Sequence, residues 1–346
     1  MKFISAKDYA NANASNAFNK WGQLGQDNRD PKLAVRRLED DVFDAKVNPK
    51  FQLSKRDRYF MIGSCFARGL EEILRSRKLA VDSYSEDFLT WRTAREGLIP
   101  LGATNRYNTA AIANDFRWHL DADASFPAES YLDVGDGLFT DPHMNPSLAN
   151  AEPSELDARR KIWGSVFAKL SGVNVVILTL GLTEAWYDNQ TQTVWNTTPD
   201  GRMQKNHPGR FSPVNLGFAD NLANLETVHG LLTQRCPENL RIIVTVSPVP
   251  LMRTFTAQDI VAANQYSKAC LRAAAQEFAN AHPNVDYFPS YEIAMNSNPA
   301  KVWEASDRRH VDGHFSIEIM RQFFAAYIPD VKFDAGGFRK LFKRLF

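Results

Sequence analysis

The sequence predicts an α/β protein in which a parallel β-sheet has helices on both faces. Three apolar runs, at 59–62, 173–180 and 240–247, show little polar alternation, as expected of strands buried on both faces. Segments with helical periodicity follow these runs. Strand and helix alternate about five times along the chain, and short crossovers of this kind favour parallel strands.

The first strand ends at Gly63, and a helix is expected over 65–78 because Phe66, Leu70 and Ile73 recur at helical spacing. A helix start of capping-box type is expected at Ser154 to Asp157. The later elements expected are strands at 79–82, 173–180, 240–247 and 285–288, and helices from Ser154, through 222–232, over 256–281 and over 317–327, with a polar loop at 306–314.

The chain is expected to fold as one domain over residues 51–330. Residues 1–50 are polar and predict an irregular arm. Two irregular insertions, at about 84–152 and 186–218, are expected to shape a substrate pocket, because long loops on a compact scaffold usually carry binding function. Residues 331–346 form a basic amphipathic tail that is expected to dock on its own domain, with peripheral membrane contact as the alternative.

Composition narrows the function classes. The 41 basic and 40 acidic residues give a net charge of +1, which argues against nucleic-acid binding. The three cysteines, Cys65, Cys236 and Cys270, are far apart, so neither a disulfide framework nor a CxxC metal site is expected. No apolar signal core and no run of about 20 apolar residues occurs, so a cytoplasmic protein is expected.

Candidate reactive side chains follow the strands. Ser64 and Cys65 lie between the first strand and its helix, where unpaired N–H groups favour a thiolate or a developing oxyanion. On the last loop, Asp307 and His310 have a spacing that lets the carboxylate reach Nδ1 of the imidazole, which leaves Nε2 for a nucleophile. A rival pair on the same loop is Asp312 with His314.

These residues carry a family resemblance. The run Gly63-Ser64-Cys65-Phe66-Ala67 is similar to the motif of the GSCFA-domain family, which resembles the SGNH (GDSL-type) hydrolases. Segments at 179–186, 245–249, 287–293 and 307–311 are similar to family segments in the same order. The resemblance covers roughly 50–325. It implies a flavodoxin-like α/β/α sandwich with a five-stranded parallel sheet, and ester hydrolysis or acyl transfer without a metal or cofactor.

The resemblance also implies roles for single residues. Cys65 occupies the nucleophile position, although a shifted turn would present Ser64 instead; His310 would be the base and Asp307 its orienting group. Thr183 stands where the superfamily has an oxyanion-binding Asn, and Asn105, within 102–108, is the other oxyanion candidate. Residues expected to bind substrate are Trp118, His119, Glu184 and Trp186.

The expected partner is a small-molecule or glycan acyl ester. The alternative function is a non-catalytic binding or scaffold protein that keeps the fold. That alternative arises because Ser64 and Thr183 depart from the superfamily pattern.

Overall fold

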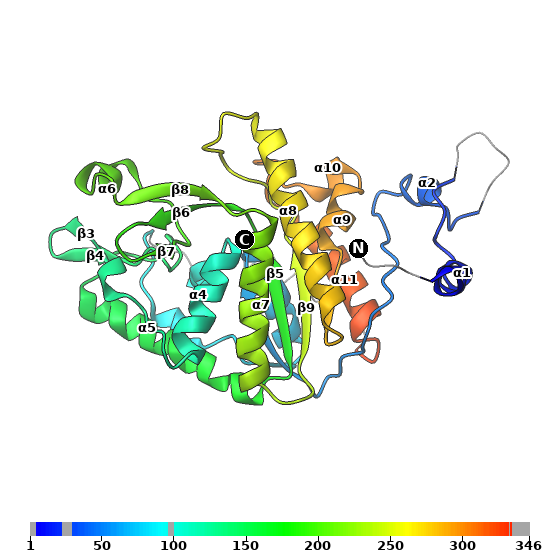
Figure 1. Cartoon of the computed structure of the whole chain (residues 1–346), viewed down its shortest axis with the longest axis horizontal. Coiled ribbons are helices and arrows are strands. Elements are labelled where there is room, and N and C mark those ends of the chain that lie inside the picture. Colours follow the sequence, from blue (N-terminus) through cyan, green and yellow to red (C-terminus); the bar gives the residue numbers. More distant parts are fainter. Residues whose placement is uncertain (1–4, 23–29, 96–99, 332, 334–346) are drawn as a thin grey trace.

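A five-stranded parallel sheet forms the centre of the protein (Figure 1). The computed structural model describes residues 5–22, 30–95, 100–331 and 333. In spatial order the sheet runs β2-β1-β5-β9-β10, and each neighbouring pair is parallel, as in flavodoxin-like folds. The strands are β1 (Arg58–Gly63), β2 (Ala80–Val81), β5 (Val175–Leu180), β9 (Arg241–Val246) and β10 (Val285–Tyr287). The predicted five-stranded parallel sheet is therefore confirmed.

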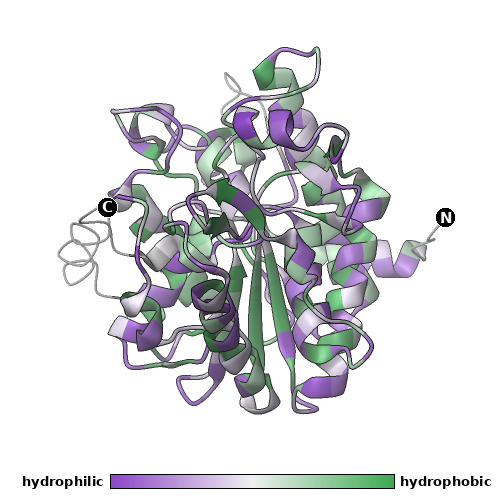
Figure 2. Cartoon of the chain, turned by 90° about the vertical axis from the view of Figure 1, so that its left-hand side faces the viewer, coloured by the Kyte–Doolittle hydropathy of each residue, from purple (hydrophilic) through white to green (hydrophobic). Residues whose placement is uncertain are grey.

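Helices cover both faces of the sheet, so the strands are apolar along their length (Figure 2). In β5, Val176 and Leu178 join one core cluster, whereas Val175 and Ile177 join the other. This alternation is the period of two of a strand buried on both sides. The first cluster packs under α4 (Thr109–Leu120), α5 (Pro153–Ala168), α7 (Phe218–Arg235) and α8 (Ile260–Ala281); the second packs under α3 (Cys65–Ser76), α9 (Ser290–Met295) and α11 (Gly313–Tyr327).

The chain order creates a switch point in the sheet. From β1 the chain moves outward to β2, then returns past β1 and builds β5, β9 and β10 on the other side. Connections from β1 and β5 therefore leave toward opposite faces, and a crevice forms beyond the carboxyl ends of these two strands. The residues that follow β1 and β5, namely Cys65 and Thr183, lie at this switch point.

The expected helix boundaries differ in detail. The helix expected from Ser154 begins at Pro153, with Glu152 as its N-cap residue and no side-chain cap. The capping-box prediction is wrong because Pro153 takes the first helical position, which its fixed φ favours.

The two predicted insertions contain more regular structure than expected. Residues 84–152 include the twelve-residue helix α4, which packs in the main core. The other elements of these regions are β3 (Leu132–Gly135), β4 (Leu138–Thr140), β6 (Glu184–Asp188), β7 (Thr193–Val194), α6 (Gly201–Asn206) and β8 (Phe211–Asn215), with 3₁₀ turns at Glu86–Thr90, Pro100–Thr104 and Ala128–Ser130. A further 3₁₀ turn, Lys169–Gly172, lies outside the insertions, between α5 and β5. Strands β6, β7 and β8 form one small antiparallel sheet, and β3 pairs with β4 (Figure 1).

The N-terminal arm, treated as irregular in the sequence analysis, contains two helices, α1 (Ala6–Ser15) and α2 (Ala34–Arg37). Residues 41–53 then run along the domain. The N–H of Phe43 donates to Ser297 Oγ (2.8 Å) and the N–H of Ala45 to Gln322 Oε1 (2.9 Å). This part of the arm packs on the second core cluster.

The basic tail expected at 331–346 lies, apart from residues 331 and 333, outside the described residues. Beyond the elements named above, α10 (Pro299–Val302) completes the helices of the described chain. Within that part of the chain, no helix combines the length and the apolar character that crossing a membrane would need.

The end of β1 approaches β5 so closely that only glycine fits at position 63. Gly63 has φ +136°, and a Cβ there would lie 2.1 Å from the carbonyl oxygen of Thr179. The neighbouring Ser64 N–H donates to that same oxygen (3.1 Å). Both the backbone conformation and the contact therefore exclude a side chain.

We expect Gly63→Ala to lower the free energy of unfolding by more than about 2 kcal/mol, because φ strain and a backbone clash add. The matched control is Gly230→Ala, in α7, where an added Cβ meets nothing within 4 Å. That change should stabilise by about 0.5–1 kcal/mol. Urea unfolding measures both variants. Equal stabilities would contradict this account of Gly63.

Candidate functional site

Cys65 and Ser64, the two alternatives for a nucleophile, have different surroundings. Ser64 is the N-cap residue of α3 and only 3 % exposed, and its Oγ lies 3.2 Å from Thr179 Oγ1. Cys65 is the first residue of α3, is partly exposed and lines a cavity. Ser64 thus faces β5, and the thiol lies beside open space.

The cavity beside Cys65 has a volume of about 500 Å³. Three segments supply its walls: the N-terminal part of α3, the turn after β9, and the loop that leads into α11 together with the first turns of that helix. Its lining includes Cys65, Phe66, Pro248, Val249, Asp307, His310 and His314. None of the described lining residues belongs to the insertions at 84–152 and 186–218, which were expected to shape the pocket.

Asp307 is held against His310. Its carboxylate contacts Nδ1 of His310 and accepts the backbone N–H groups of Arg309 (2.9 Å) and His310 (3.0 Å). These two N–H groups, and next the imidazole, lower the pKa of Asp307 to about 2. The carboxylate is therefore ionised at neutral pH, although both side chains are exposed.

The loop that carries this pair is closed on itself. The Glu304 N–H donates to the His310 carbonyl (2.9 Å), and the Arg308 N–H donates to the Glu304 carbonyl (2.8 Å). Arg308 has φ +51°, in the left-handed region, which is uncommon for a residue with a Cβ. An antiparallel bridge between Trp303 and Val311 forms the base of the loop.

Arg309 fixes which nitrogen of His310 carries the proton. Its Nε donates to the Pro250 carbonyl (3.2 Å), and its guanidinium lies 3.3 Å from His310 Nε2. A guanidinium has donors only, so Nε2 is the nitrogen whose lone pair accepts this contact. The proton therefore sits on Nδ1, facing Asp307.

The rival pair, Asp312 and His314, is arranged differently. The Asp312 carboxylate accepts the backbone N–H groups of His314 (2.7 Å) and Phe315 (3.2 Å), and so caps α11. His314 lines the cavity but does not receive this carboxylate on its ring.

The thiol of Cys65 is protonated at rest. Burial raises its pKa, while Arg309, the N–H groups of Phe66 and Cys65, and Lys268 oppose this effect. The sequence predicts an activated thiol on the basis of the helix N-terminus. That expectation did not include the desolvation of the thiol, which raises its pKa by more than the N–H groups at the start of the helix lower it.

Lys268, from α8, is a buried cation at the carboxyl edge of the sheet. It is 0 % exposed, and its Nζ donates to the carbonyls of Gly181 (2.7 Å), Ser247 (2.8 Å) and Val249 (2.7 Å). Burial lowers its pKa to about 7. The three carbonyls belong to the turns after β5 and β9, so Lys268 ties these turns together. Sequence analysis missed it because a lysine in a long Ala-rich helix gives no signal of burial.

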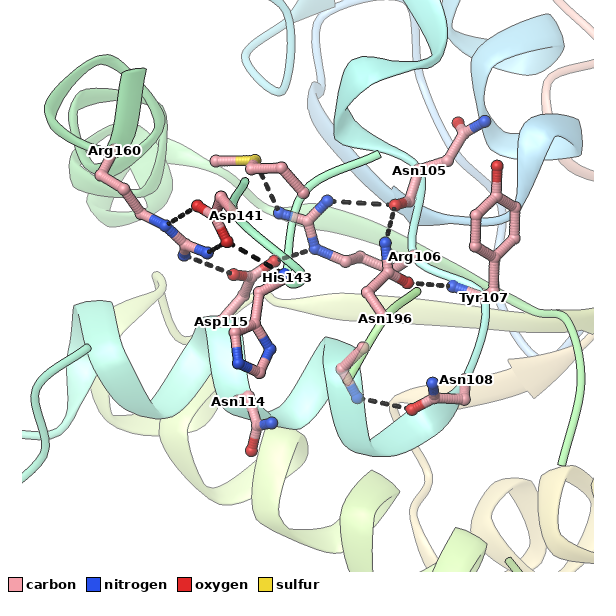
Figure 3. A network of polar contacts seen from close by, with 12 residues as sticks. Asn105, Arg106, Tyr107, Asn108, Asn114, Asp115, Asp141, His143, Arg160 and Asn196 are labelled. Carbon is pink, nitrogen blue, oxygen red and sulfur yellow. Dashed lines mark hydrogen bonds and ion pairs between the residues drawn. The ribbon is translucent and has the colours of Figure 1, made fainter. Parts of the chain in front are cut away.

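Asn105 lies in a segment that runs beside the end of β1. Asn105 bridges Gly63, and the Arg106 N–H donates to the Gly63 carbonyl (2.7 Å). The side chains alternate: Asn105 and Tyr107 point to one side, and the fully buried Arg106 points to the other (Figure 3). Asn196 holds the segment, since its amide accepts the Tyr107 N–H (2.8 Å) and donates to the Asn105 carbonyl (2.8 Å).

A buried ion network anchors Arg106. The Arg106 guanidinium pairs with Asp115, from α4, and donates to the Asn105 carbonyl (3.0 Å) (Figure 3). Asp115 also lies 3.9 Å from Arg160, which makes two bonds of 2.7 Å to Asp141. This network fixes the segment that presents Asn105.

Thr183, the other oxyanion candidate, is fully buried after β5. Its N–H donates to Ser267 Oγ (3.1 Å), and its hydroxyl has no hydrogen-bond partner among the described residues. Asn105 is 5 % exposed, and the carbonyl oxygen of its side chain, Oδ1, also has no hydrogen-bond partner among the described residues. Neither belongs to the described lining of the cavity. Tyr107, which sequence analysis missed, receives the Asn145 amide on its hydroxyl (2.7 Å). Burial raises the pKa of Tyr107, and the nearby Cys65 adds to this effect.

Trp118 and His119, expected to bind substrate, lie at the last turn of α4, outside the described cavity lining. Trp118 packs against His143 (ring centroids 4.8 Å apart) and His119 against Phe167 (4.7 Å). Burial lowers the pKa of His119, so its ring is neutral at neutral pH. The two residues are placed as packing groups.

Glu184 and Trp186, also expected to bind substrate, support the loop after β9. The Glu184 carboxylate accepts the Thr254 hydroxyl (2.7 Å) and the Phe255 N–H (3.0 Å). The Trp186 ring packs on Phe255, with centroids 5.7 Å apart. The described lining of the cavity includes neither residue.

Replacing Lys268 by Met should lower the free energy of unfolding by at least about 2 kcal/mol, because buried carbonyls lose their donor. Urea unfolding measures the change. The control is Lys301→Met on exposed α10, which should stay within about 0.5 kcal/mol of the parent protein. If the two variants were equally stable, the bonding role given to Lys268 would be wrong.

The rate of Cys65 alkylation by iodoacetamide should have its pH midpoint above the roughly 8.5 of a free thiol, because burial raises the pKa. Arg309→Gln should move the midpoint higher still, since Arg309 is the main group that favours the thiolate. Peptide mass spectrometry measures Cys65, with Cys236 as an internal control because burial raises its pKa to about 12. A midpoint below that of a free thiol would show a resting thiolate instead.

A family model described as the GSCFA family matches residues 58–323, which include β1, Cys65 and the Asp307–His310 loop. No curated protein matches the sequence. The matched residues are well over half of the 346-residue chain, from the first strand of the sheet into its last helix. The chain therefore belongs to the GSCFA family.

Proposed function

We propose that this protein is an SGNH-type hydrolase or acyltransferase that cleaves ester bonds through an acyl-cysteine intermediate. One observation carries the proposal: Cys65 shares a cavity with His310, whose Nδ1 contacts the Asp307 carboxylate. A nucleophile, a base and a group that orients the base are the parts that nucleophilic acyl transfer requires. Ser64, with its hydroxyl turned to Thr179, is the less suited nucleophile.

In the proposed first step, Sγ of Cys65 attacks the acyl carbonyl carbon while Nε2 of His310 takes the thiol proton. The tetrahedral intermediate collapses, its bond to the alcohol oxygen breaks, and the proton on His310 passes to that leaving oxygen. The enzyme now carries a thioester. In the second step His310 takes a proton from water, or from an acceptor hydroxyl or amine. The activated oxygen or nitrogen attacks the thioester, and the Cys65 sulfur leaves and regains the proton.

A protonated resting thiol suits this scheme. Because burial raises the pKa of Cys65, the thiol proton must leave during the attack on the acyl carbonyl. The general base His310, and not the helix N-terminus, therefore activates the thiol. Asp307 stays ionised at neutral pH, so it can stabilise the imidazolium that forms on His310. Arg309 contacts Nε2 of His310 in the resting state, so its guanidinium must move away before this nitrogen accepts the thiol proton.

The oxyanion donors proposed are the N–H of Cys65, at the first turn of α3, and the side chain of Asn105. Support for Asn105 comes from its bridge to Gly63, which places it beside the end of the strand that leads to Cys65. Buried polar groups are rarely left unpaired without a role. Thr183 has an unpaired hydroxyl and is the second candidate. Losing a true oxyanion donor would slow turnover by about 10²–10³-fold.

The test is to trap the intermediate. The protein is mixed with p-nitrophenyl acetate, quenched in acid and digested, and acetylated peptides are identified by mass spectrometry. We expect acetyl on Cys65, and we expect His310→Ala to slow its formation by about 10²–10⁴-fold because the general base is lost. Asp307→Asn should slow it less.

The matched control is Arg308→Asn, on the same exposed loop, because Asn tolerates the left-handed φ of this position. It should leave acetylation unchanged. Circular dichroism establishes that each variant is folded. Acetyl found elsewhere, or equal rates in the wild type and His310→Ala, would contradict the proposed chemistry and favour a binding protein with this fold.

A further inference from the structure

A second cluster of titratable side chains lies away from the cavity, where α7 packs against the end of α8. Glu226 and His229 are three residues apart on α7, a spacing that places both on one face of the helix. His282 is the C-cap residue of α8. All three side chains are half-buried. His229 and His282 are far apart in the sequence and meet only in the folded chain.

The three side chains converge. Nε2 of His282 lies 2.8 Å from Glu226 Oε2, and the rings of His229 and His282 stack with centroids 3.8 Å apart. One potential ligand atom from each residue lies within 4.8 Å of the other two. Two imidazoles and one carboxylate form a donor set that zinc sites in proteins use.

The surroundings of His229 fix which of its two nitrogens can bind a cation. A metal binds an imidazole through the nitrogen that carries no proton. Nε2 of His229 lies 3.2 Å from Asn284 Oδ1, which can only accept, so the lone pair is on Nδ1. Such a hydrogen bond on the far nitrogen is typical of ligating histidines.

We propose that Glu226, His229 and His282 bind one divalent transition-metal ion, for which Zn²⁺ is the best match. The ion would replace the direct contact between His282 Nε2 and Glu226 Oε2. Ligand atoms at about 2.0–2.2 Å from a tetrahedral ion lie closer together than 4.8 Å. Two stacked rings cannot aim their lone pairs at one ion, so the rings of His229 and His282 must rotate out of their stacked arrangement when the ion binds. Water would fill the fourth position.

This site is separate from the proposed acyl chemistry. His282 follows Lys268 by fourteen residues along α8, which is about 20 Å at 1.5 Å per residue. Lys268 bonds the turns at the carboxyl edge, whereas His282 precedes β10 at the opposite edge. The ion would join α7 to α8 and so stabilise the packing of the helices on one face of the sheet.

The test is calorimetric titration of the full-length, chelator-treated protein with Zn²⁺. The titrations use the Cys65→Ser background, because the cavity groups Cys65, Asp307 and His310 could also bind zinc. We expect one ion per chain. We expect Glu226→Gln and His282→Gln each to weaken binding by more than about tenfold, because losing a residue that only hydrogen-bonds to a ligand already costs at least about that much. Asn284→Ala should weaken it by about 10–100-fold.

The matched control is His207→Gln, at the end of α6, which should bind Zn²⁺ as the background does. Glu226→Gln keeps the side-chain volume, and thermal unfolding without metal establishes that it folds. Cobalt substitution gives a second readout: the spectrum should lack a thiolate band and should change in His282→Gln. Absence of stoichiometric binding in the background protein, or unchanged affinity in the folded Glu226→Gln and His282→Gln variants, would overturn the proposal.

Discussion

The close approach of β1 to β5 at Gly63 is the constraint on which the rest of the site depends. A carbonyl of β5 occupies the space of a side chain at position 63, so the chain turns directly from strand into helix. That turn sets Cys65 on the first residue of α3 and Ser64 against Thr179. A similar contact recurs at Gly181, where a Cβ would lie 2.5 Å from the Tyr107 carbonyl. Backbone packing thus fixes both strand ends of the switch point.

Charge at this edge is distributed in two layers. In the inner layer, the buried amine of Lys268 donates hydrogen bonds to three backbone carbonyls. Above, Asp307, Arg309 and His310 occupy an exposed loop whose shape comes from backbone bonds. The turns at the edge of the sheet and the loop that carries Asp307 and His310 are therefore held by separate sets of hydrogen bonds.

Strands β1, β5 and β9 could be predicted from sequence because each is a nearly continuous apolar run with a turn residue at its end. Helix α4 could not, because Asn114 and Asp115 are polar yet buried, and they break the apolar stripe that marks a helix. Asn114 donates to the carbonyl of Val194, which is distant in the sequence. Asp115 pairs with Arg106, whose burial is equally hard to predict from the sequence. Asp307 and His310 were found because their contact is local. Lys268 and the Glu226 cluster were missed because their partners meet only in the folded chain.

Residues 41–53 of the N-terminal arm have a consequence for the edge of the sheet. β10 is an edge strand, and an uncovered edge can pair with the edge of another molecule. The Lys50 N–H donates to Asp286 (3.0 Å), within β10, and its amine donates to the carbonyl of Val285 (2.8 Å). The family match begins at residue 58, after this segment. A fragment that begins at residue 58 would keep every strand of the sheet but would lose the segment that covers the edge strand β10. Such a fragment would self-associate and aggregate more readily.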